Sequence, residues 1–139
     1  EIKYIEPVAL HHEMSRLRNE RKMDFLESLT GMDWGEPAEN DAPDTVRGLG
    51  GVYHLESTTT GERIAVKTST LNRENPEIPS VCDLWKAAEL NEREVYDYYG
   101  IVFVGHPDMR RLLLRNDWVG YPVRNDNGNR TEPGWKYKK

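Results

Sequence analysis

Two carboxylates at helical spacing are the first candidates for a catalytic site in this chain. Glu94 and Asp97 are three residues apart in a stretch of helical pattern, so their side chains can share one face. Two neighbouring carboxylates raise one another's pKa, which suits a general acid. The alternative is a charged cluster in which they pair with Arg93, Arg110 or Arg111. We favour the cluster, because structural ion pairs are commoner than catalytic ones.

His106 is the next candidate, because it stands between Gly105 and Pro107 and could act as a base or as a metal ligand. A metal site needs three or four ligands, and the other histidines show no ligand spacing to His106. The single cysteine, Cys82, cannot by itself supply the clustered thiolates of a zinc or iron–sulfur site. We therefore expect no cofactor and no metal, and we interpret His106 as a structural histidine that bonds a backbone carbonyl.

A free-standing acid/base enzyme that uses Glu94, Asp97 and His106 is the alternative from a different class of function. It requires a deep pocket that encloses all three side chains. Side chains turned into the core, or spread over a flat surface, would instead indicate a segment that holds a neighbouring protein.

The composition indicates one soluble domain with an uneven charge. The chain has 139 residues, of which 37% are hydrophobic and 31% charged. No apolar run approaches the roughly 20 residues that a membrane-spanning helix needs. Residues 105–139 carry eight Lys/Arg against four Asp/Glu, which predicts a basic C-terminal arm on an acidic body. Nucleic acid is not an expected partner, because the net charge is −5 and no basic stripe is interleaved with aromatic residues.

Apolar spacing and turn-forming residues predict the elements of the N-terminal half. One helix is indicated by apolar residues at i, i+4 and i+7, namely Leu10, Met14 and Leu17. A second, short helix is predicted over Asp24–Leu29, with Gly31 as its C-terminal cap. The acidic, proline-containing residues 34–44 are predicted to form an exposed loop.

The following residues predict a hairpin, a long helix and two short strands. Alternating, β-branched residues over Gly51–Ser57 and Arg63–Thr70 indicate the hairpin. The helix is predicted to begin at Ser80, where Ser80 and Asp83 have the spacing of a capping box, and to end at Gly100. The strands are expected at Ile101–Val104 and Arg110–Leu114. These elements predict an α+β domain of two layers over residues 1–115, with helices packed on a small mixed sheet, followed by an extended basic arm over residues 116–139.

An ordered series of short motifs runs through this helix and the strands after it: Glu-Arg-Glu, an aromatic-Asp segment, Gly-Ile, Gly-His-Pro and Arg-Arg. The positions are Glu92, Arg93, Glu94, Tyr96, Asp97, Gly100, Ile101, Gly105, His106, Pro107, Arg110 and Arg111. With this series, the stretch Pro79–Asp126 resembles the C subunit of NADH:quinone oxidoreductase, respiratory complex I. The sequence departs from the family further on, where a second motif, Gly-His-Pro-Leu-Arg, is usual. Here Tyr121 replaces the histidine and Val123 replaces the leucine, whereas Arg124 is retained.

The resemblance implies a non-catalytic subunit of the cytoplasmic or matrix arm of that complex, with no cofactor and no activity of its own. It implies contact with other subunits, chiefly the one that forms the quinone site, and contact with the membrane only through the complex. The motif residues, Arg124 included, are then structural or interface residues. The same subunit type occurs in membrane-bound hydrogenase and F420H2 dehydrogenase complexes, which remain as alternatives.

Overall fold

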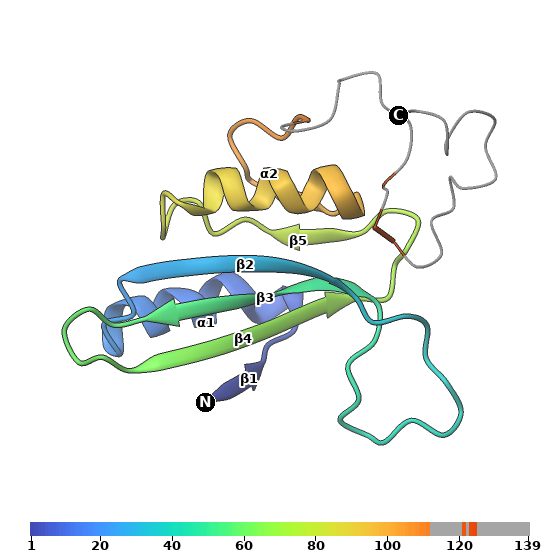
Figure 1. Ribbon diagram of the computed structural model, residues 1–139, viewed down its shortest axis with the longest axis horizontal. Helices are drawn as coiled ribbons and strands as arrows, with labels where there is room; N and C mark the ends of the chain where they lie inside the picture. Colours follow the sequence, from blue (N-terminus) through green and yellow to red (C-terminus); the bar gives the residue numbers. More distant parts are fainter. Residues whose placement is uncertain (112–120, 122, 125–139) are drawn as a thin grey trace.

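The helix that the sequence predicts near the N-terminus is present in the computed structural model, which describes residues 1–111, 121, 123 and 124. This helix, α1, spans Pro7–Glu20 and has a proline in its first turn, where no backbone N–H is needed (Figure 1). Its buried residues are Leu10, Met14 and Leu17, as their spacing predicts. The apolar face of α1 therefore points into the core.

Four strands form the main sheet, in the order β1-β4-β3-β2. They are β1 (Ile2–Tyr4), β2 (Phe25–Asp33), β3 (Leu49–Glu56) and β4 (Arg63–Thr70). β3 and β4 are the predicted hairpin, and β1 joins β4 in parallel, so the sheet is mixed. A separate parallel pair is formed by β5 (Glu77–Pro79) and β6 (Val102–Val104), of which β6 confirms the strand expected after Gly100.

The short helix predicted over Asp24–Leu29 is wrong, because this stretch belongs to β2. Leu26 and Leu29 are both buried although they are three residues apart. The pairing of β2 with β3 shifts register between Leu26 and Ser28, and such a bulge adds a residue and resets the alternation of the strand. The same i, i+3 spacing that indicates a helix therefore arises here from a bulged strand.

The long helix is shorter than predicted. α2 spans Ala88–Tyr99 and ends at Gly100, which adopts the left-handed conformation. The capping box predicted at Ser80 and Asp83 is wrong, since turns occupy the residues between Val81 and the helix. Ser80 Oγ instead accepts a hydrogen bond from the amide of Cys82, 3.1 Å away.

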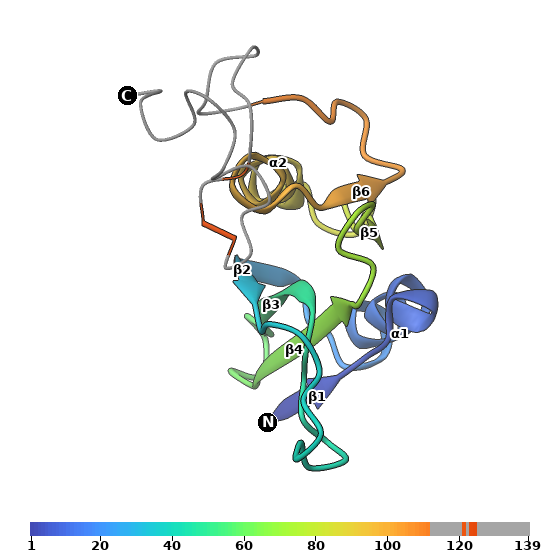
Figure 2. The ribbon, with the colours of Figure 1, turned by 90° about the vertical axis from the view of Figure 1, so that its right-hand side faces the viewer.

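The two helices pack against different strands. α1 contacts β4 and β5, whereas α2 contacts mainly β2 and β6 (Figure 2). At the crossing of α2 and β2, a Cβ on Gly31 would lie 2.4 Å from the ring of Tyr99, so only glycine lets the helix approach this closely. Buried apolar residues from both helices and from every strand except β1 join in one core. The predicted α+β architecture, helices on a mixed sheet, is confirmed.

Some expectations fall at the limit of what the structure describes. In the stretch Arg110–Leu114, expected to be a strand, neither arginine is in a strand and residues 112–114 lie outside the described residues. The domain boundary predicted between residues 115 and 116 lies outside them as well, as does most of the arm. Among the helices formed by the described residues, none has the length and apolar character required to cross a bilayer.

Candidate functional site

Glu92 is the most buried charged group at the start of α2. Its side chain is fully buried, and one carboxylate oxygen accepts hydrogen bonds from Ser80 Oγ at 2.7 Å and from Cys82 Sγ at 3.2 Å. The other oxygen accepts the backbone N–H of Val81 at 2.9 Å. Burial raises the pKa of Glu92, while these donors oppose the shift. Glu92 thus attaches the segment after β5 to α2.

His106 lies close to this carboxylate, but both of its ring nitrogens are already bonded. The atoms of His106, Cys82 and Glu92 that could bind a metal ion lie within 4.8 Å of one another. Nε2 of His106 donates to the carbonyl of Glu89 at 2.8 Å, while Nδ1 accepts the amide of Asp108 at 2.8 Å. Burial also raises the pKa of the Cys82 thiol to about 12, which opposes the thiolate that a metal requires. The three groups fit a hydrogen-bonded cluster and not a metal centre.

The Gly-His-Pro turn folds back over the free edge of β6. The amide of Phe103 donates to the Met109 sulfur at 3.3 Å, and the carbonyl of Phe103 accepts the amide of His106 at 3.1 Å. Gly105 permits this return because its φ is +95°. The backbone groups that an edge strand would offer to another chain are therefore used within the molecule.

A second cluster lies at the other end of α2, around Asp97 and Arg111. Nη1 of Arg111 donates to the backbone carbonyl of Asp97 at 2.7 Å and lies 3.5 Å from the Asp97 carboxylate. The Asp97 side chain is 0% exposed and that of Arg111 is 8% exposed. The guanidinium also lies over the rings of Tyr96 and Tyr121, 5.6 and 4.9 Å from their centroids. This buried pair attaches the chain after the Gly-His-Pro turn to α2.

Arg93 and Arg110 have different surroundings although they belong to the same motif series. Arg93 donates to the backbone carbonyls of Arg110 and Arg111, at 3.2 and 3.0 Å, and so fixes the backbone that carries both. The Arg110 side chain is 63% exposed and bonds Asp108, which is exposed as well, at 2.8 Å. Arg93 and Arg111 are therefore positioning groups, whereas Arg110 is available at the surface.

Arg124 adds a third connection, between the C-terminal part of the chain and the sheet. It is buried and donates to the carbonyl of Arg73 at 2.9 Å, and Arg73 in turn bonds the Asp33 carboxylate at 2.7 Å. Tyr121 packs beside it against Gly100, where a Cβ would lie 2.7 Å from the ring. Sequence reasoning missed Asp33 and Arg73, because they are 40 positions apart and no local pattern links them.

The three residues of the acid/base alternative do not converge. Glu94 is exposed, whereas Asp97 is buried in its ion pair. His106 bonds Glu89, eight residues before Asp97 on the helix and so about 12 Å away along its axis. The geometry opposes a shared reaction centre. Instead, the motif residues connect the turn after β6 and the chain beyond it to one helix.

The chain is thus an α+β domain whose motif residues attach the stretch from His106 to Arg111 to one helix. The family that matches is described as "Respiratory-chain NADH dehydrogenase, 30 Kd subunit", and its model covers residues 3–132. The chain belongs to this family.

Relatives agree with this membership. The chain is 79% identical over 127 residues, 91% of its length, to the C/D subunit of the NADH-quinone oxidoreductase of Bacteroides fragilis, but it spans only 24% of that protein. It is 40% identical to the C subunit of the NADH-quinone oxidoreductase of Moorella thermoacetica, over 87% of this chain and 75% of the relative.

Two solved structures have the same fold. A trypsin-resistant fragment (1-134) of Nqo5 aligns with a TM-score of 0.63 at 34% identity, over 76% of this chain and 79% of the fragment. A chain of an archaeal membrane-bound sulfane sulfur reductase aligns with a TM-score of 0.72 at 25% identity, over all of this chain and 79% of the other.

Proposed function

We propose that this chain is a non-catalytic part of NADH-quinone oxidoreductase that supports the quinone-site subunit while electrons pass from NADH to quinone. It belongs to the arm outside the bilayer, on the cytoplasmic face of the cell membrane or on the matrix face in a mitochondrion. Its partners are the other subunits of the complex, and it holds no cofactor itself.

One observation carries this proposal: the motif residues are used to hold the chain itself together. Glu92, Asp97, His106 and Arg111 all bond groups of the same molecule, which leaves them poorly placed to act on a substrate. Such bonding gives a rigid surface, and rigid surfaces bind partners at a lower entropic cost. Family membership and the names of the relatives agree with a supporting role.

The equivalent subunit of another membrane-bound redox complex is the second candidate. It is favoured by the alignment of the whole chain with a chain of the sulfane sulfur reductase. The higher identity to the C and C/D subunits of NADH-quinone oxidoreductases favours the first proposal.

The proposal is tested in the source organism with an affinity tag on the natural, full-length protein. Membranes are solubilised in mild detergent, and the tagged protein is purified and examined by mass spectrometry and for NADH:quinone activity. We expect the other subunits of the complex to co-purify, and we expect deletion of the gene region encoding this chain to abolish the membrane activity. Purification without those subunits, or activity that survives the deletion, would refute it.

A further inference from the structure

The loop between β2 and β3 is held in one shape by its own bonds. Its two ends are joined by hydrogen bonds between Trp34 and Gly48, at 2.8 Å, and between Gly48 and Gly35, at 2.7 Å. Inside the loop, Asp41 makes a bidentate ion pair with Arg47, at 2.6 and 2.9 Å. This pairing lowers the pKa of Asp41 to about 2, so the pair is charged at neutral pH. The loop is therefore a preformed wall.

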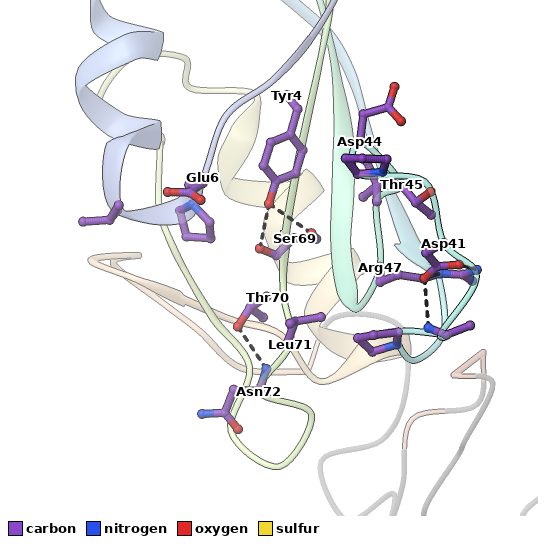
Figure 3. A pocket seen from close by; sticks show the side chains of 16 residues that line it. Tyr4, Glu6, Asp41, Asp44, Thr45, Arg47, Ser69, Thr70, Leu71 and Asn72 are labelled. Atoms are coloured by element: carbon purple, nitrogen blue, oxygen red, sulfur yellow. Dashed lines mark hydrogen bonds and ion pairs between the residues drawn. The ribbon is translucent and has the colours of Figure 1, made fainter.

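The opposite wall is built by the end of β1, the start of α1 and the end of β4. The hydroxyl of Tyr4 bonds Ser69, with its oxygen 3.2 Å from Ser69 Oγ. Thr70 Oγ1 accepts the amide of Asn72 at 3.2 Å and so fixes the turn after β4. Between the two walls lies a groove of about 870 Å³ (Figure 3). We call it the loop groove.

Apolar side chains in the loop groove are left largely uncovered. Val8 is 90% exposed, Leu71 61% and Tyr4 47%. Pro37, Pro43 and Val46 add apolar surface from the loop. A concentration of exposed apolar groups with a polar border is typical of a surface that another molecule covers.

The charges that line the loop groove indicate the charge of the molecule that would cover it. Asp41 and Arg47 neutralise each other, whereas Glu6 and Asp44 also line the groove and form no ion pair within the described part of the chain. The net charge of the groove is therefore negative. It lies on a body, residues 1–104, that carries 20 acidic against 11 basic residues. A segment with apolar residues and at least one Lys or Arg is complementary to both features.

We infer that the loop groove binds an apolar segment bearing Lys or Arg from a neighbouring subunit of the complex. This inference rests on the proposed function, because it takes the partner from the same assembly. No residue of the Arg111 or Glu92 clusters lines the groove, so it would be a separate contact. Because both walls are already fixed, binding needs little ordering of this chain.

The test places the photo-crosslinking residue p-benzoylphenylalanine at position 71 of the full-length protein, in the assembled complex. We expect irradiation to join it to one peptide of a neighbouring subunit that contains apolar residues and Lys or Arg. The double charge reversal E6K/D44K should lower the yield of this product about tenfold, since it replaces attraction by repulsion on the groove. E36K/E39K is the matched control, because it reverses two charges on exposed residues of the same loop that do not line the groove.

The crosslinked product decides between partner binding and its alternatives. The loop groove is not a partner site if the complex assembles but position 71 gives no product, or gives only a second copy of this chain, a lipid or an acidic peptide. The same conclusion follows if E6K/D44K and E36K/E39K lower the yield equally. If the wild-type protein co-purifies with no other subunit, the proposed function fails and this inference fails with it, which distinguishes that outcome from the others.

Discussion

Replacing Arg111 by alanine should destabilise the domain severely, whereas the same change at the adjacent Arg110 should not. Removal of Arg111 takes away the guanidinium that lies 3.5 Å from the Asp97 carboxylate, which is 0% exposed. Stranding one member of a buried pair costs about 3 to 5 kcal/mol. The cation–π contacts with Tyr96 and Tyr121 are lost as well. Arg110 and its partner Asp108 are exposed, so Arg110→Ala should cost about 0 to 1 kcal/mol.

The assay is equilibrium unfolding in urea of the purified domain, followed by tryptophan fluorescence and circular dichroism. A third protein, Asp97→Asn/Arg111→Met, removes both charges and leaves neither stranded. Its loss should therefore be smaller than the sum of the losses of the single variants Asp97→Asn and Arg111→Met, by about 0.5 to 3 kcal/mol. Equal losses for Arg110→Ala and Arg111→Ala, or strictly additive losses in the double variant, would show that Asp97 and Arg111 do not act as a buried pair.

Three more predictions concern the surroundings of α2. Burial raises the pKa of Glu92 in the folded state, so the folded protein holds this proton more tightly than the unfolded chain. The stability that Glu92 contributes is therefore greatest in acid, and it falls as pH rises from the ordinary pKa of a glutamate through the raised pKa. The penalty of Glu92→Gln in urea unfolding should therefore shrink as pH rises above the ordinary pKa of a glutamate. Cys82, whose pKa is raised to about 12, should react with iodoacetamide at neutral pH on the order of a hundredfold more slowly than a free thiol, and should react readily in urea. Gly100→Ala should cost more than Gly61→Ala. Both glycines have positive φ, which costs an alanine about 1 to 2 kcal/mol, but only at Gly100 would the added Cβ also meet the ring of Tyr121.

Contrary results are easy to recognise. A Glu92→Gln penalty that grows with pH would mean that the carboxylate form is the one that the fold prefers. Labelling of folded Cys82 as fast as of the unfolded chain would show that its thiol is not protected. Equal costs for the two glycine replacements would remove Tyr121 from the packing against Gly100.

The elements whose pattern depends on neighbouring residues are predictable from the sequence. The helical spacing that ends at Leu17, the alternation of the β3–β4 hairpin and the glycine that stops α2 all follow from backbone geometry, which acts over a few residues. The ordered motif series in residues 92–111 was sufficient to indicate the family.

Which partners these elements and charges meet depends on the tertiary packing. The spacing of Leu26 and Leu29 predicts a helix, but pairing with β3 makes this segment a strand with a bulge. Arg110 and Arg111 are identical in type and adjacent, yet one is exposed and the other is buried against Asp97. The reason is that burial and pairing depend on which distant segments meet, and the free energy of a charge depends on the solvent and partners that it finds there. Those surroundings are set by the packing of the whole chain, and no local pattern contains them.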